Sequence, residues 1–220
     1  MLALDSDLTE RTSPFQLFVG RNLLTAQQLR ALSESAPTTR VEKISVEDPQ
    51  HEKQYRMNLL SLIEAEVETE HVRALPAAWR VLLDDLRGEE FTTWLEQSTG
   101  IKLTGLPRSI GLYTHRNGDF LSVHKDKPTK AITAILYLND RWPNEAGGRF
   151  QCFTTGDSNV EPTVELAPVG GQLLAFKPTD HSWHAVSEIR HPDGKDRLTM
   201  QVEYWVSTDL MGSAYHPSGR

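Results

Sequence analysis

A histidine and an aspartate two residues apart are the first groups in the chain that could act together chemically. They are His124 and Asp126, in the segment VHKDKPTK (residues 123–130). In a β-strand, residues two apart point to the same side, so this imidazole and carboxylate could face one point. By chance such a pair usually lies in a surface loop, so a metal site needs support from elsewhere in the chain.

Two further histidines lie in the segment LLAFKPTDHSWHAV (residues 173–186). They are His181 and His184, in a turn between two short apolar stretches. Either could be a third ligand, or both could be surface residues. Because Cys152 is the only cysteine, a disulfide framework and a thiolate zinc site are excluded. Two imidazoles and one carboxylate form the ligand set of non-haem Fe(II) oxygenases, which leaves other metal positions open.

A third candidate group lies on the last predicted strand, RLTMQVEYWV (residues 197–206). Apolar residues alternate there with polar ones, and helices packed on the apolar face would turn the polar face inward. An inward polar face is costly unless it binds something. Arg197 on this face needs an anion, and its planar guanidinium matches a carboxylate with two hydrogen bonds. Thr199 on the same face could add a hydroxyl donor. The apolar face comprises Leu198, Met200, Val202, Tyr204 and Val206.

Helical signals are concentrated in the first hundred residues. Thr25 and Gln28 have the spacing of a capping box, which predicts a helix start. Pro76 can open a second helix, and Gly88 and Gly100 can end the second and third. We expect these helices to support the fold, because their apolar stripes are typical of core packing. The stripes are Leu29 and Leu32, then Trp79, Leu82, Leu83 and Leu86, then Phe91, Trp94 and Leu95.

From about residue 105 the apolar pattern changes to the period of two that is typical of strands. Several short strands with turns between them indicate a sandwich or barrel. We therefore expect a mainly β fold with supporting helices packed outside. The predicted strands are 131–138, 148–153, 162–166, 170–176 and 197–206.

The bulk composition fits an ordinary globular domain. The chain has 220 residues, of which 38% are hydrophobic and 24% charged, and its formal net charge is −7. This charge argues against nucleic acid or an anionic membrane as a partner. The N-terminus lacks the pattern of a signal peptide, and no apolar stretch is long enough to span a membrane. We expect a cytoplasmic protein, and the sequence carries no signal for its oligomeric state.

Several of these segments together resemble the 2-oxoglutarate- and Fe(II)-dependent oxygenases, in particular the prolyl 4-hydroxylase-like branch. The resemblance covers roughly residues 76–207 and rests on GLYTHRNGDFLSVHKD, AILYLNDRWPNEAGGRF and GGQLLAFKPTDHSWHAV. It implies a double-stranded β-helix, which is a cupin-like jelly-roll barrel, as the catalytic core at 105–207. Residues 1–104 are then mostly helical support and 208–220 a tail, within a single domain over 1–220.

The resemblance also implies the roles of the metal-binding residues. His124, Asp126 and His184 match the catalytic metal ligands of the family. His184 is preferred to His181 because the family's distal histidine is followed, one residue on, by a strand valine, here Val186. The implied cofactors are Fe(II) and the cosubstrate 2-oxoglutarate, with O2 as oxidant.

Four further residues match the cosubstrate pocket of the family. Arg197 and Thr199 match the pair that binds the distal carboxylate of 2-oxoglutarate, and Tyr113 and Tyr137 match tyrosines that line the pocket. Tyr137 could equally be an ordinary core residue of a strand.

The implied activity is hydroxylation of an unactivated C–H bond, with release of succinate and CO2. We favour a small-molecule substrate, an amino acid or an amino-acid-derived unit. The alternatives are hydroxylation of a prolyl or other side chain in a protein, and a metal-dependent binding module without turnover.

A segment before the barrel could close over the substrate. EKQYRMNLLSL (residues 52–62) alternates as a strand does and places Arg56 and Asn58 on one face. An amino-acid-like substrate carries a carboxylate, and Arg197 would already hold 2-oxoglutarate. We therefore expect Arg56, with Asn58 beside it, to bind the substrate, although the segment could also be a solvated edge strand.

Overall fold

The helices lie where the sequence predicts them. The structure is a computed structural model that describes residues 1–5, 7–37, 41–48 and 50–206. Thr25 and Gln28 form a complete capping box, and Gly100 ends the third helix in the left-handed conformation. The expected tail lies outside the described residues. The helices are α1 (Ala26–Glu34), α2 (Ala77–Arg87) and α3 (Glu89–Thr99), with the 3-10 turns η1 (Glu70–Ala74) and η2 (Asn144–Ala146).

The strands of the described residues pair into one continuous sheet. They are β1 (Thr9–Arg11), β2 (Leu17–Gly20), β3 (Glu42–Val46), β4 (Tyr55–Glu64), β5 (Val67–Glu68), β6 (Arg108–His115), β7 (Phe120–His124), β8 (Lys130–Tyr137), β9 (Phe150–Phe153), β10 (Val164–Leu166), β11 (Leu173–Phe176), β12 (Trp183–Val186) and β13 (Arg197–Trp205).

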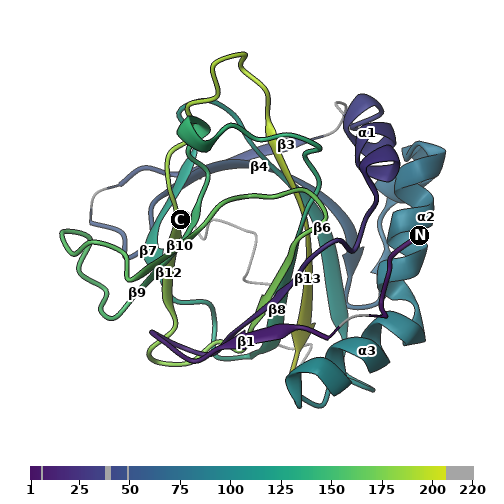
Figure 1. Ribbon diagram of the computed structural model, residues 1–220, viewed down its shortest axis with the longest axis horizontal. Helices are drawn as coiled ribbons and strands as arrows, with labels where there is room; N and C mark the ends of the chain where they lie inside the picture. Colours follow the sequence, from purple (N-terminus) through teal and green to yellow (C-terminus); the bar gives the residue numbers. More distant parts are fainter. Residues whose placement is uncertain (6, 38–40, 49, 207–220) are drawn as a thin grey trace.

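The sheet curls back on itself into a jelly-roll double-stranded β-helix (Figure 1). Its strand order is β1-β2-β11-β8-β13-β6-β4-β7-β12-β9-β10, with β3 and β5 paired to β4. The long strand β4 makes the bend, because most of it pairs with β6 while Tyr55 and Arg56 pair with β7. The strands that carry the candidate histidines therefore lie opposite the strand that carries Arg197.

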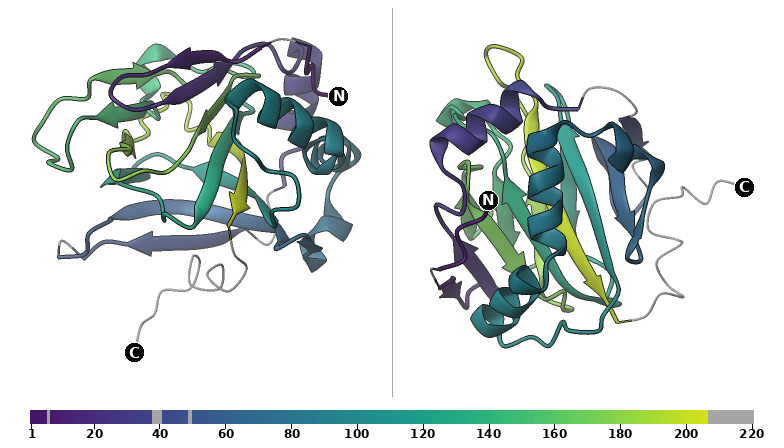
Figure 2. Two further views of the ribbon diagram at one scale, coloured as in Figure 1. Left: turned by 90° about the horizontal axis from the view of Figure 1, so that it is seen from below. Right: turned by 90° about the vertical axis from the view of Figure 1, so that its right-hand side faces the viewer.

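Strand β13 shows how the two faces of the sheet differ. Its apolar residues Leu198, Met200, Val202 and Tyr204 belong to the main core, which lies between the sheet and the helices. Figure 2 shows the helices stacked against this outer face. The other face of β13 points into the curled sheet and buries Arg197, Thr199 and Glu203, as the alternation predicts. Among the described residues, every helix is too short or too polar to cross a membrane.

Two features differ from expectation. The part of the chain before residue 105 contributes strands β1, β2, β3 and β5 in addition to β4, and β2 extends the sheet beside β11. These strands are only two to five residues long, so they show too little alternation to be predicted. In addition, Asp193-Gly194 is a dipeptide that favours a tight hairpin, but this turn connects β12 to β13, which are not paired with each other.

Trp79 tests how strongly the helices depend on their packing. It is fully buried, and its indole nitrogen donates to Leu32 O at 3.1 Å, which ties α2 to α1. Trp79→Ala should lower the free energy of unfolding by about 3–5 kcal/mol, because it leaves a large cavity. Val81→Ala, at an exposed position of the same helix, should change it by less than about 0.5 kcal/mol. Urea unfolding followed by circular dichroism measures both, and equal effects would contradict this account of the core.

Candidate functional site

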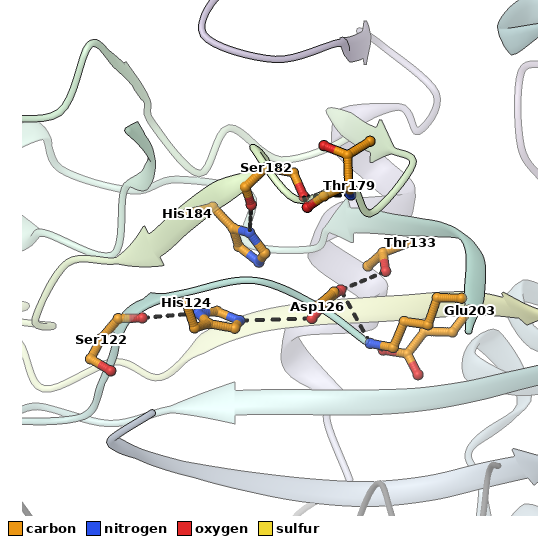
Figure 3. A network of polar contacts seen from close by, with 9 residues as sticks. Ser122, His124, Asp126, Thr133, Thr179, Ser182, His184 and Glu203 are labelled. Carbon is orange, nitrogen blue, oxygen red and sulfur yellow. Dashed lines mark hydrogen bonds and ion pairs between the residues drawn. The ribbon is translucent and has the colours of Figure 1, made fainter. Parts of the chain in front are cut away.

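Three potential metal ligands come together where β7 and β12 lie side by side. His124 ends β7 and is paired directly with His184 of β12, with ring centroids 4.2 Å apart. Asp126 follows two residues after the end of β7. One ligand atom from each of the three side chains lies within 4.8 Å of the others (Figure 3). His181 is exposed in the preceding turn and is not part of this cluster.

The aspartate reaches this cluster in a different way from the one expected. The expectation that His124 and Asp126 share one strand is wrong, because β7 ends at His124 and Asp126 lies in the following loop. The carboxylate is oriented by hydrogen bonds rather than by strand alternation. Its Oδ2 accepts from Thr133 Oγ1 at 2.7 Å and from Lys130 Nζ at 3.1 Å. Its Oδ1 is left facing His124 Nε2 at 3.7 Å.

The two histidines present the same ring nitrogen to the cluster. Nδ1 of His124 lies 2.9 Å from Ser122 O, and Nδ1 of His184 lies 2.9 Å from Ser182 O. A carbonyl oxygen can only accept, so each Nδ1 carries the proton and each Nε2 keeps a lone pair. Such a backbone contact is the usual way in which a metal-binding histidine is oriented.

The charge states also suit a metal. Burial lowers the pKa of His124 to about 3, and it lowers the pKa of His184 as well, so both imidazoles are neutral. Burial alone would raise the pKa of Asp126, but the Lys130 ammonium holds it well below its usual range. Two neutral imidazoles and one carboxylate, without a thiolate, fit Fe(II) and leave further metal positions open.

A buried network of charged side chains includes the Asp126 carboxylate. Lys130 Nζ contacts Asp126 Oδ2 at 3.1 Å and Glu203 Oε1 at 2.6 Å, and it lies over the Trp205 ring. Burial opposes the charged form of Lys130, but the Asp126 and Glu203 carboxylates raise its pKa above the usual value. Lys130 therefore remains charged and holds Asp126 ionised.

Arg197 is a buried cation without a carboxylate partner in the described part of the chain. Its side chain is 1% exposed, and its Nε donates to Gly148 O at 2.9 Å. Its Nη2 lies 3.5 Å from Tyr137 OH, and the guanidinium carbon lies 5.0 Å from the centre of the Tyr137 ring. Burial lowers the pKa of Arg197, which is the cost of an uncompensated charge. An anion such as a carboxylate of 2-oxoglutarate would relieve this cost.

The other predicted cosubstrate residues surround Arg197 on the same face. Thr199 is paired with Tyr113 on β6 and with Tyr137 on β8, and all three are buried. Gly148 leaves room for the arginine, since a Cβ there would lie 2.8 Å from Arg197 Cδ. The structure thus brings together Arg197, Thr199, Tyr113 and Tyr137.

The predicted substrate-binding residues lie on the wrong face of their strand. Asn58 is paired with Thr114, and its side-chain nitrogen donates to Thr114 O at 3.3 Å. It shares its face of β4 with Leu60, which belongs to the main core. Arg56, two residues before Asn58, contacts the Phe120 ring and Glu47. Both side chains therefore point away from the metal cluster. Alternation separates the two faces of a strand correctly, but it does not tell which face is the inner one.

Sequence reasoning missed several residues on the inner face. Lys130, Thr133 and Glu203 support Asp126, and Lys53 precedes the first inward residue of β4, Tyr55. For Glu203 the signal was present, because it lies on the polar face of β13 predicted from alternation. For the others the signal was only a polar residue in or next to an apolar strand.

Comparison with known proteins agrees with this geometry. The family model of the 2OG-Fe(II) oxygenase superfamily matches residues 110–206. No curated protein sequence matches the chain. The matched segment holds the three candidate metal ligands and Arg197.

Solved structures share the fold at low sequence identity. A prolyl-4-hydroxylase from Pseudomonas putida is 19% identical with a TM-score of 0.54, over 87% of this chain and 92% of that one. A prolyl hydroxylase from Trichoplax adhaerens, bound to a peptide of hypoxia inducible factor, is 16% identical with a TM-score of 0.57, over 90% and 87%. HygX from Streptomyces hygroscopicus, with nickel and 2-oxoglutarate bound, is 10% identical with a TM-score of 0.51, over 86% and 82%. Residues 110–206 thus match the 2OG-Fe(II) oxygenase superfamily, the chain has a prolyl 4-hydroxylase-like fold, and its His-Asp-His cluster fits an enzyme that uses Fe(II), 2-oxoglutarate and O2.

Proposed function

We propose that the enzyme hydroxylates an unactivated C–H bond of a small molecule, an amino acid or an amino-acid-derived unit. The observation that carries the reaction class is the His-Asp-His cluster inside the curled sheet that also buries Arg197. Fe(II), 2-oxoglutarate and O2 supply the oxidising chemistry, in which one oxygen atom enters the substrate and the other enters succinate, with release of CO2.

His124, Asp126 and His184 are the proposed metal ligands. Each contributes one atom, Nε2 from the histidines and Oδ1 from the aspartate. Ser122 O and Ser182 O hold the imidazole rings, while Thr133 and Lys130 hold the second carboxylate oxygen. These contacts fix the ligand atoms before the metal arrives, which lowers the cost of binding it.

Arg197 is the proposed partner of the distal carboxylate of 2-oxoglutarate. Gly148 O and Tyr137 hold the guanidinium in place, so its remaining N–H groups can form a bidentate pair. Thr199 and Tyr113 line the same inner face two positions further along β13 and β6. Together these side chains orient the cosubstrate and keep water away from it.

The side chains on the inner face of β4 favour the proposal of a small substrate. Its inward side chains Tyr55, Met57 and Leu59 pack with Tyr113 and Ile44 into an apolar cluster beside the cosubstrate residues. Apolar side chains of the sheet therefore occupy part of the inner face. A small molecule fits beside this cluster more readily than a segment of a folded protein.

Hydroxylation of a prolyl or other side chain in a protein is the second candidate. It is supported by the fold shared with the T. adhaerens prolyl hydroxylase, which was solved with a peptide fragment. A screen of free amino acids against proline-containing peptides, read out by succinate formation and product mass, separates the two. Acceleration by peptides alone would overturn the small-molecule proposal.

The ligand proposal predicts which histidine the metal needs. His124→Ala, Asp126→Ala and His184→Ala should each weaken Fe(II) binding by more than the roughly 10- to 100-fold that the loss of an orienting partner costs. His181→Ala is the matched control and should leave the iron content unchanged, because His181 is exposed outside the cluster. Iron content measured after anaerobic loading decides this. Loss of iron in His181→Ala with retention in His184→Ala would contradict the assignment.

The hydrogen bond behind Asp126 can be tested separately. Thr133→Val removes the 2.7 Å contact to Asp126 Oδ2 at nearly constant volume, so Fe(II) affinity should fall roughly tenfold. Thr129→Val is the control, because the buried Thr129 hydroxyl has no hydrogen-bond partner among the described residues. Competition with a fluorescent chelator measures both affinities. Equal affinities of the two variants would show that Thr133 does not orient the ligand.

The cosubstrate proposal predicts a selective defect in Arg197 variants. Arg197→Lys keeps the charge but loses the planar fork, so the affinity for 2-oxoglutarate should fall about 10- to 100-fold. Iron content should stay near that of the wild type. Arg190→Ala, which removes an exposed arginine from the loop before β13, serves as the control. An unchanged apparent affinity for 2-oxoglutarate in Arg197→Ala would refute the role.

A further inference from the structure

A lysine that precedes β4 is fixed next to the metal cluster. Lys53 is followed by Gln54, which is tied to Ser122 of β7 by two hydrogen bonds. Gln54 N donates to Ser122 Oγ at 2.8 Å, and Ser122 N donates to Gln54 O at 2.9 Å. Ser122 O in turn accepts from His124 Nδ1. The backbone of Lys53 is thus one residue from a strand contact that also orients a metal ligand.

The side chain of Lys53 points to the inner face. Tyr55, two residues later, lies on the inward side of β4 with Met57 and Leu59, and the Lys53 ammonium lies 5.6 Å from the centre of the Tyr55 ring. Lys53 is partly buried, and this burial lowers its pKa, while the Asp126 carboxylate acts in the opposite direction. The charge of Lys53 also helps to lower the pKa of His124. Lys53 therefore belongs to the electrostatic surroundings of the metal cluster.

No carboxylate in the described part of the chain lies within 4.0 Å of this ammonium. The nearby acids have other partners, since Asp126 contacts Thr133 and Lys130, and Glu203 contacts Lys130. The proposed position of 2-oxoglutarate places its distal carboxylate at Arg197, on a different strand. Lys53 is therefore a partly buried cation on the inner face without a carboxylate partner within 4.0 Å among the described residues.

Two other cations, Lys125 and Arg56, do not fit this role. Lys125 contacts Asp180 at 3.5 Å and lies over the Trp183 ring. Arg56 points to the opposite face of β4, where it contacts Phe120 and Glu47. Lys53, just before β4, lies instead on the inward side, with its ammonium 5.6 Å from the centre of the Tyr55 ring.

We propose that Lys53 binds a carboxylate of the substrate and thereby positions the substrate beside the metal. This inference rests on the proposed small-molecule function and narrows it to molecules with a free carboxylate. An ammonium is a compact point charge that attracts a carboxylate without the planar match that an arginine requires. Its partial desolvation strengthens the attraction.

The test compares free L-amino acids with their neutral amides, each supplied singly to the iron-loaded enzyme with 2-oxoglutarate. Succinate formation gives the KM of each acid and of its amide. For an acid that accelerates the wild-type enzyme, the amide should have a KM about 10- to 100-fold higher, as expected for loss of a charge-assisted pair. In Lys53→Met the KM of the acid should rise until the two values are similar. Lys53→Arg should keep most of the preference.

Arg56→Met is the matched control, because it removes a cation from the other face of the same strand and should keep the wild-type ratio. The ratio is taken within each variant, so partial unfolding affects acid and amide alike. A preference for the acid that persists in Lys53→Met would overturn the role of Lys53 and leave the hydroxylase proposal intact. If no free amino acid accelerates the wild-type enzyme, the small-molecule proposal itself fails, and the role of Lys53 fails with it.

Discussion

The inner face of the curled sheet must bury charged side chains, and the arrangement of the site follows from that constraint. A buried charge is stable only with a partner or a ligand. Lys130 is satisfied by two carboxylates, and this leaves Asp126 Oδ1 available to a metal. Arg197 has neutral contacts but no carboxylate among the described residues, so it is suited to an anionic cosubstrate. On the proposed assignment, the available oxygen of Asp126 binds the metal and the unpaired charge of Arg197 binds the cosubstrate.

Much of this site could be predicted from the sequence because its residues stand next to regular patterns. The alternation in β13 placed Arg197 and Thr199 inward, and the short strand at His184 distinguished it from His181 once the family resemblance was applied. Asp126 was identified for a reason that proved wrong, since hydrogen bonds from Thr133 and Lys130 orient it in a loop. Those bonds connect residues whose pairing depends on the tertiary fold, and periodicity does not reveal them.

The substrate side shows a different limit. The segment before the barrel was recognised as a strand, and Arg56 and Asn58 do share a face. The inner face is decided by pairing with β6, where Leu59 lies opposite Tyr113 and Asn58 opposite Thr114. Strand register depends on contacts between segments more than 50 positions apart, so a single sequence could not supply it. The same register places Tyr55 on the inner face, and Lys53 lies two positions before it.

The tie between Gln54 and Ser122 has a consequence for how the enzyme can diversify. It clamps the start of β4 to the strand that ends in a proposed metal ligand. Because the tie uses the main chain of Gln54, the exposed side chains of His51 and Glu52 can be substituted without breaking it. On the opposite side of the sheet, the main core under the helices stabilises the fold. On the proposed function, the residues that would contact the substrate therefore lie on the opposite face of the sheet from the main core, and substitutions among them leave that core intact.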